Sequence, residues 1–179
     1  DIQKVTQKSL SNHISMVLQD PIIFSGTVEE NIKYKAKSTI EDVIEASKLV
    51  GAHDFIKDLP NGYNTILEES GANLSIGQKQ LLSFARAILL NSKIFILDEA
   101  TSYIDSYTER KIQQGLDQVL KNRTGIIIAH RLSTIQNADK IIVLDKGEIQ
   151  EIGSHTDLIS NKGLYWKLWN NNQSSFDDL

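Results

Sequence analysis

The sequence predicts an α/β protein built on a mostly parallel sheet, and three observations support this prediction. Four short apolar runs are typical of strands: Ile14–Leu18, Ile94–Leu97, Gly125–Ala129 and Ile141–Leu144. Each run is continuous rather than alternating, which favours strands buried on both faces of a parallel sheet. Between the runs lie segments with apolar residues three and four positions apart, so that strands alternate with helices.

The helices and the last strands follow from spacing and turn residues. Helices are expected at Ile40–Val50, Lys79–Leu90 and Thr108–Leu120. The segment Asp145-Lys146-Gly147-Glu148 is a turn signal, so Lys140–Leu144 and Glu148–Ile152 are expected to pair as a hairpin at the sheet edge.

The distribution of helix along the chain predicts its organisation. Residues 25–91 carry most of the helical pattern and no strong strand, which indicates a helical subdomain. It would be inserted between residues 1–24 and 92–179, the two portions of an α/β core. We therefore expect residues 1–179 to form part of one domain.

Composition excludes several classes of protein. The 179 residues include 19 Lys and Arg against 23 Asp and Glu, a net charge of −4, and no cysteine. Disulfides, thiolate zinc sites and a cysteine nucleophile are therefore excluded. An acidic chain without a long basic run is not expected to bind nucleic acid. No apolar run approaches the length of about 18 residues typical of a membrane span, so the chain is not expected to insert into a membrane.

Polar side chains follow three of the expected strands. Gln19 follows the first run, Asp98 and Glu99 follow the second, and His130 follows the third. Ligands of open parallel sheets bind outside the carboxyl ends of the strands, so these residues are candidates for one site. The alternative is that polar residues simply end strands.

Each of these residue types suits phosphate chemistry. Asp98 could hold Mg²⁺ bound to nucleotide phosphates, and Glu99 could act as general base on an attacking water. His130 could hydrogen-bond the γ-phosphate or that water, and the amide of Gln19 could contact both metal and water.

A second candidate site is Leu74-Ser75-Ile76-Gly77-Gln78, just before an apolar-periodic helix. Ser75 is well placed as the N-cap, and Gly77 would let a ligand approach the backbone closely. The first-turn amides and the helix dipole would then attract an anion. The alternative interpretation is a capped helix start with no ligand.

Together these motifs resemble the ATP-binding domain of ATP-binding cassette (ABC) transporters of the exporter type, over residues 1 to about 170. The matching segments are Leu74–Gln78 (signature), Ile94–Glu99 (Walker B), Ser102–Asp105 (D-loop), Ala129–Thr134 (H-switch), Gln19–Ile32 (Q-loop) and Glu68–Gly71 (the exporters' transmembrane-coupling loop).

The sequence departs from the family pattern at three points. Ile76 replaces the first glycine of the signature pair; we expect an ordinary helix-start position there, with Gly77 the indispensable glycine. Glu68 stands where the family usually has glycine. None of the ten glycines is followed by lysine, so the phosphate-binding Gly-x-x-x-x-Gly-Lys-Ser/Thr loop is absent. We therefore expect that an N-terminal portion of the domain is missing from this chain.

The resemblance implies a P-loop NTPase-like fold with helices on both faces of the sheet, and ATP and Mg²⁺ as ligands. It implies that Glu99, His130 and Gln19 are catalytic and that Asp98 and Gln19 hold the metal. Four signature residues, Leu74, Ser75, Gly77 and Gln78, would contact ATP held by a partner, and Ser102 and Asp105 would form the D-loop. The intact protein would hydrolyse ATP to drive export, and this chain by itself is expected to be inactive.

The implied partners are a second ATP-binding domain, in a homo- or heterodimer, and the transmembrane domain of an exporter. The expected location is the cytoplasmic face of a membrane. Two alternatives stay open at this point: a soluble ABC ATPase of translation or DNA repair, and a non-catalytic fragment that acts by docking its signature on a partner.

Overall fold

The computed structural model describes residues 1–98, 112, 116, 120, 123–128 and 135–174. The chain divides into two compact units, Asp1–Ile128 and Ala129–Leu179. Each unit is described by itself. The finer division into residues 1–24, 25–91 and 92–179 stays a prediction.

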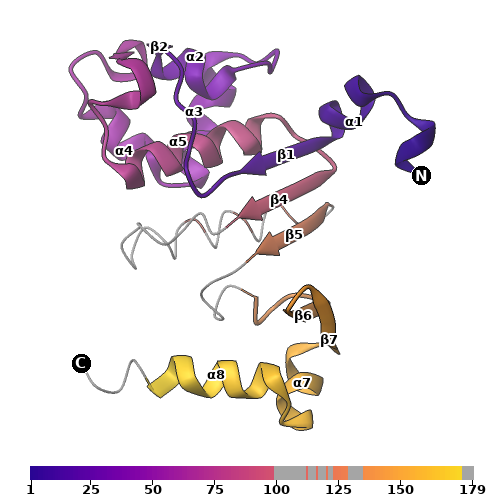
Figure 1. The fold of residues 1–179 in the computed structure, drawn as a ribbon. Coiled ribbons are helices and arrows are strands. Elements are labelled where there is room, and N and C mark those ends of the chain that lie inside the picture. The colour runs from indigo at the N-terminus through magenta and orange to yellow at the C-terminus, as the bar shows by residue number, and fades with distance from the viewer. Residues whose placement is uncertain (99–111, 113–115, 117–119, 121–122, 129–134, 175–179) are drawn as a thin grey trace. The chain divides into compact units, whose positions relative to one another are not determined.

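The first unit contains the parallel sheet that the sequence predicts. Its strands are β1 (Ile14–Val17), β4 (Ile94–Asp98) and β5 (Thr124–Ile128), hydrogen-bonded in the order β1-β4-β5 (Figure 1). Both pairings are parallel, with Val17 opposite Leu97 and Leu97 opposite Ile127. The α/β class and the three strand positions are thereby confirmed.

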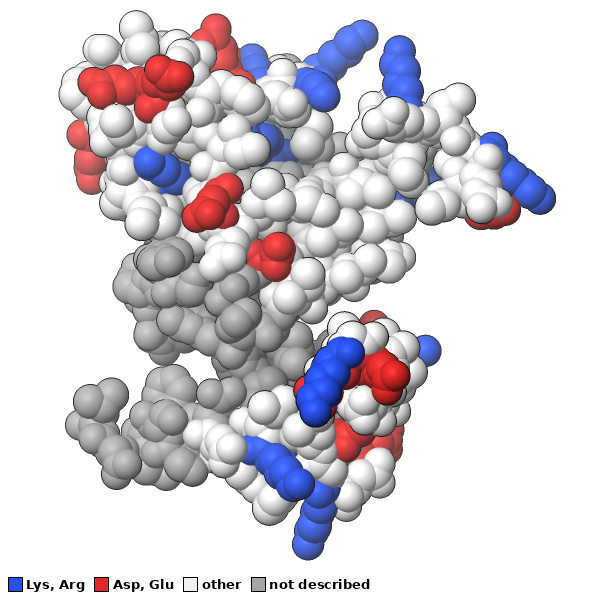
Figure 2. Space-filling view, viewed as in Figure 1, with Lys and Arg blue, Asp and Glu red and all other residues white. Residues whose placement is uncertain are grey.

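Burial within this sheet differs from the sequence expectation. The continuous apolar runs predict burial on both faces, but in β1 Ser15 and Val17 are buried while Met16 is 50% exposed. Ile126 and Ile128 of β5 are also exposed. The reason is that one face of β1 lies against the helix α5, whereas Figure 2 shows an accessible, largely uncharged surface over β1, β4 and β5. Continuity of a run therefore does not by itself establish two-sided burial.

Most of the first unit between β1 and β4 is helical, as expected. Its α-helices are α1 (Gln7–His13), α2 (Val28–Lys33), α3 (Ile40–Leu49), α4 (Ala52–Lys57) and α5 (Ile76–Leu89). Its 3-10 helices are η1 (Ile2–Lys4), η2 (Gly62–Asn64) and η3 (Glu69–Gly71), and β2 (Gly26–Thr27) pairs antiparallel with β3 (Ile66–Leu67).

The core of this unit forms around α5, which contacts α2, α3, α4 and β1. Leu82 and Phe84 of α5 are fully buried with Ile32 of α2 and Val43 of α3. Ile112 and Leu116 are helical and buried in the same cluster, in agreement with a helix at this position; most of the expected helix Thr108–Leu120 lies outside the described residues.

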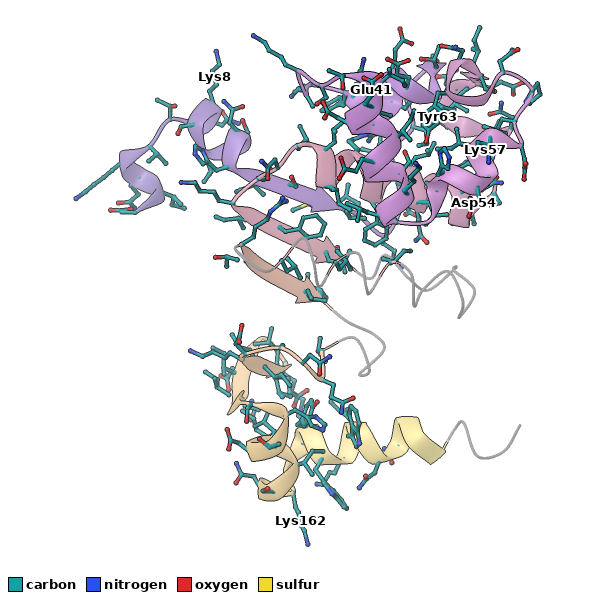
Figure 3. All side chains as sticks on the ribbon, turned by 180° about the vertical axis from the view of Figure 1, so that it is seen from behind. Lys8, Glu41, Asp54, Lys57, Tyr63 and Lys162 are labelled. Atoms are coloured by element: carbon teal, nitrogen blue, oxygen red, sulfur yellow. The ribbon has the colours of Figure 1, made fainter. Side chains whose placement is uncertain are left out.

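A polar pair of side chains links α4 to η2. Tyr63 lies beside α3 and α4 (Figure 3), and its hydroxyl is 2.9 Å from Nδ1 of His53. Burial raises the pKa of Tyr63, and its hydrogen bond with Ser47 opposes that rise. Tyr63 is therefore a neutral hydrogen-bonding partner at ordinary pH.

The second unit contains the predicted hairpin and two helices. Among the described residues the hairpin forms a two-stranded sheet of its own, so the expectation that it lies at the edge of the parallel sheet is wrong. Strands β6 (Ile141–Asp145) and β7 (Glu148–Gly153) pair antiparallel, and α7 (His155–Asn161) and α8 (Leu164–Ser174) follow. Ile141, Val143, Leu158 and Tyr165 form its core. Among the described residues, no helix is long and apolar enough to cross a bilayer.

The start of α8 depends on a glycine. The carboxylate of Glu151 on β7 accepts from the backbone N–H groups of Leu164 (2.6 Å) and Tyr165 (3.1 Å). A Cβ at Gly163 would overlap this carboxylate. Gly163 thus lets an acid from β7 supply the acceptor that a helix start lacks.

Candidate functional site

The carboxyl ends of β1, β4 and β5 lie at one edge of the sheet. Asp98 ends β4 and pairs with Ile128, the last residue of β5. Gln19 lies two residues beyond Val17, the end of β1, and is exposed. The register therefore brings the ends of the segments carrying Gln19 and Asp98 to the same edge. Glu99 and His130, expected there too, lie outside the described residues.

This edge suits a hard cation. The carboxylate of Asp98 and the amide of Gln19 offer oxygen ligands, which Mg²⁺ prefers. Within the described part of the chain, no group of three His, Cys, Asp or Glu side chains could hold a metal.

The signature segment forms the start of α5, as the sequence predicts. Ser75 is the N-cap: its Oγ accepts from the N–H of Gln78 at 3.2 Å, and Oε1 of Gln78 accepts from the N–H of Ser75 at 3.0 Å. This reciprocal pair is a capping box. Leu74 is buried just before it, and its N–H donates to the carbonyl of Gly71.

The first turn of α5 is open to a ligand. Ile76 is the first helical residue, and neither Ile76 nor Gly77 adopts a positive φ. The prediction that Ile76 occupies an ordinary helix-start position is therefore confirmed. The capping box uses the N–H of Gln78, and helix geometry leaves those of Ile76 and Gly77 without an intrahelical acceptor. These groups can bind an anion.

The charge of the first turn of α5 also favours anion binding. In the described part of the chain three other helices begin with a capping box, and each has an acid at its third position: Glu30 in α2, Asp42 in α3 and Asp157 in α7. In α5 that position is the neutral Gln78, and the first turn holds no acid. The positive end of the α5 dipole is thus not offset by a carboxylate of its own.

Two polar side chains of α5 hold the segment that follows β1. Gln80 is fully buried, and its Nε2 donates to the carbonyl of Gln19 at 3.4 Å. Arg86 donates to the carbonyls of Ile22 (2.9 Å) and Asn31 (2.8 Å). Sequence reasoning missed both residues. For Gln80 a signal existed, since it lies four and eight positions before the apolar Phe84 and Ile88, on a core-facing row of the helix.

Arg86 also joins two aromatic rings. Phe24 and Tyr34 stack at 5.2 Å with 9° between their planes, and the guanidinium of Arg86 lies 5.2 Å and 5.5 Å from the two ring centres. Burial lowers the pKa of Arg86, opposed by its electrostatic interaction with Tyr34. Tyr34 has φ 46°, and such a conformation in a non-glycine residue costs of order 1–3 kcal/mol.

A groove of about 440 Å³ lies beside this cluster. It is lined by residues of α1, β1, α5 and the segments 22–24 and 34–36, among them Ile22, Phe24, Tyr34 and Arg86. Ile22, Phe24 and Tyr34 are exposed by 54%, 42% and 47%. Large apolar side chains exposed together around a groove are typical of an interaction site.

The loop before the signature contacts the same segment. Ser70 and Gly71 have φ of 57° and 63°, and a Cβ at Gly71 would lie 3.1 Å from the side chain of Ile23. Glu68, which stands where the family usually has glycine, has φ −69° and is therefore unstrained. The expected D-loop residues Ser102 and Asp105 lie outside the described residues.

Comparison with known proteins identifies a family. Residues 1–102 match the family model "ABC transporter". The chain is 53% identical over 165 residues to an uncharacterized ABC transporter ATP-binding protein of Bacillus subtilis, YknV, covering 92% of this chain and 27% of that protein. It is 48% identical over 169 residues to an ATP-dependent lipid A-core flippase of Syntrophus aciditrophicus, covering 94% and 28%.

A solved structure agrees with these relatives. A bacterial Atm1-family ABC exporter with ATP bound matches with a TM-score of 0.90 and 42% identity, over 96% of this chain and 30% of that one. The chain thus spans about a quarter to a third of the length of these three proteins.

Proposed function

This chain belongs to the ABC transporter family, and we propose that it is part of the ATP-hydrolysing domain of an exporter. The observation that carries the proposal is the start of α5: a capped helix end, free of acids, on the segment that matches the family signature. The likeness to an exporter with ATP bound and to a lipid A-core flippase favours an exporter over a soluble ABC ATPase.

We assign the hydrolytic roles to the carboxyl edge of the sheet. Asp98 and the amide oxygen of Gln19 would hold Mg²⁺, which when bound would offset negative charge on the phosphates. Glu99 would accept the proton of the attacking water, and His130 would donate a hydrogen bond to the γ-phosphate. Ser102 and Asp105 would form the D-loop.

We assign the signature to a second subunit's ATP. Ser75 and Gly77 would bind its γ-phosphate through the hydroxyl and the free first-turn N–H groups, and Gln78 would contact it through its side-chain Nε2. Leu74 would anchor the turn in the core. Function would then require a dimer, homo- or heteromeric. The sequence lacks Gly-x-x-x-x-Gly-Lys-Ser/Thr, so we expect the isolated chain neither to bind ATP tightly nor to hydrolyse it.

The groove beside Arg86 would contact the transmembrane domain of the exporter. Its exposed rings and apolar side chains suit a short apolar helix, and Gln19 lies at the end of the strand that lines it. Such contact would place the domain at the cytoplasmic face of a membrane and connect Gln19 to the transport pathway.

The catalytic part of the proposal is tested with Glu99→Gln in the full-length protein. The amide keeps the size of glutamate but cannot accept the proton, so ATP hydrolysis should fall by about 10²-fold or more while ATP binding persists. Hydrolysis at the parental rate would remove Glu99 from the role of base.

The dimer is tested with mixed dimers that carry Gly77→Asp and Glu99→Gln. If the signature acts on the partner's ATP, one change in each subunit spoils the same site and leaves the other whole. Both changes in one subunit, opposite an unaltered partner, spoil both sites. If the signature acts on its own subunit's ATP, the two results are reversed. A dimer with Glu99→Gln in one subunit measures what a single intact site supports.

A further inference from the structure

Gln80 is a buried amide with incomplete hydrogen bonding. Its side chain is 0% exposed, in the second turn of α5. Nε2 makes one long contact, 3.4 Å to the carbonyl of Gln19, and Oε1 has no hydrogen-bond partner among the described residues. Exchanging the two amide atoms would place Oε1 against the Gln19 carbonyl oxygen, so this orientation is the better one.

An apolar residue would suit this position better if packing were its only role. Gln80 lies in line with the buried Phe84 and Ile88 of the same helix. A buried acceptor without a partner costs more free energy than a single neutral hydrogen bond returns. The single long contact does not offset that cost, so stability alone does not explain why a glutamine occupies this position.

The position of Gln80 supplies such a reason. It is two residues after Gln78, which closes the capping box at the start of α5. Its contact reaches Gln19, 61 positions earlier in the chain, at the end of the strand that neighbours β4 and Asp98. One buried side chain thus joins the first turns of the signature helix to the segment that carries a candidate metal ligand.

We propose that Gln80 is a positioning residue that holds Gln19 in register with the start of α5, so that a displacement of this helix start moves Gln19. The inference rests on the proposed function, which gives the helix start and Gln19 their ligands. The long Nε2 contact fits a side chain whose hydrogen bond to Gln19 shortens when the 19–24 segment shifts. A shift of a few tenths of an ångström would bring the 3.4 Å contact to the usual length of about 2.9–3.0 Å.

The first test measures amide hydrogen exchange in the full-length protein without nucleotide. Gln80→Met keeps the length of the side chain and removes both polar groups. Exchange in the 19–24 segment, where the N–H of Phe24 donates to Asn31, should rise about 2- to 10-fold, because loss of the contact to the Gln19 carbonyl lets the segment open more often. Ser47→Ala is the matched control, because Ser47 is equally buried and its hydrogen bonds, to Val43 and Tyr63, do not involve this segment. Unchanged exchange in the 19–24 segment of Gln80→Met would overturn the proposal.

The second test separates positioning from packing. Gln80→Met should lower kcat for ATP about 3- to 10-fold with little change in KM, and this loss should disappear when Gln19→Ala is already present. Ser47→Ala should leave kcat unchanged. A loss that persists in the Gln19→Ala background would overturn the proposal. If Gln19→Ala alone changes neither kcat nor the Mg²⁺ dependence, the proposed role of Gln19 is wrong, and the exchange result still decides whether Gln80 holds its backbone.

Discussion

The helices α5 and α7 begin with the same capping box but differ in its charge, which is neutral in α5 and negative in α7. In α7, Ser154 accepts from the N–H of Asp157, and the Asp157 carboxylate accepts from both the N–H and the hydroxyl of Ser154. In α5 the neutral Gln78 takes the place of this acid. An acid at the third position offsets the helix dipole, whereas glutamine closes the box and leaves the dipole available.

This difference separates a helix start that serves only the fold from one that can also bind phosphate. Helices α2, α3 and α7 keep the more stabilising acid, and α5, the longest of the four, does without it. An acid in the α5 turn would add to stability by a few tenths of a kcal/mol and would repel an anion. Stability and phosphate binding therefore make opposite demands at Gln78.

The largest expected effect comes from an acid at the second position of α5. Gly77→Asp should lower ATP hydrolysis by the full-length dimer about 100-fold or more, because a carboxylate facing a phosphate in an interface costs several kcal/mol. The control is Thr156→Asp, the corresponding position of α7, which should leave hydrolysis unchanged. Equal losses in both variants would show that the two helix starts do not differ in function.

At the third position of α5 a substitution should have two smaller effects of opposite sign, on hydrolysis and on helix protection. Gln78→Glu should lower hydrolysis about tenfold by repelling phosphate, yet protect the first turn of α5 slightly better against amide exchange, since the acid favours the helix dipole. Steady-state hydrolysis and exchange on the same sample measure both. If hydrolysis and protection fell together, lost folding rather than charge would explain the defect.

Substitution of either N-cap serine should destabilise its own helix start to the same extent, but only one substitution should affect function. Ser75→Ala and Ser154→Ala should each cost about 1 kcal/mol at their own helix start, seen as about fivefold faster amide exchange in that first turn. Only Ser75→Ala should also lower hydrolysis. A comparable loss of hydrolysis in Ser154→Ala would contradict the assignment of phosphate binding to α5 alone.

The smallest effect is a difference in pH dependence. The side-chain and backbone hydrogen bonds of Ser154 lower the pKa of Asp157 below its ordinary value. The cap of α7 is therefore fully formed above the ordinary pKa of Asp, about 3.9, and weakens as pH falls through the lower folded value. Between pH 6 and pH 3, amide protection of the first turn, corrected for intrinsic exchange, should fall in α7 more than in α5. In Asp157→Asn this additional fall should vanish.

Much of this molecule could be predicted from local sequence. The positions of β1, β4 and β5, the hairpin of β6 and β7, and Ser75 as an N-cap follow from apolar runs, turn residues and a capping pattern. These features depend on residues a few positions apart, so the sequence displays them directly. The motifs that identify the family are local for the same reason.

Other features depend on which segments meet in space. The side chains of Met16 and Ile126 are exposed although both lie in apolar runs, and α5 lies on one face of β1. A continuous apolar run has the same sequence pattern whether one or both faces of the strand are buried. Arg86 lies against a stacked pair of rings from other segments, a contact that no spacing within α5 predicts.

The sequence by itself determined the fold class, the family and the residue types of the candidate site, because each can be recognised from residues a few positions apart. Only the tertiary structure decided that Gln80 reaches the carbonyl of Gln19 and that the ends of β1 and β4 lie side by side. Contacts between residues 61 to 80 positions apart form because core packing brings whole elements together. Local sequence patterns do not indicate which side chains then come into contact.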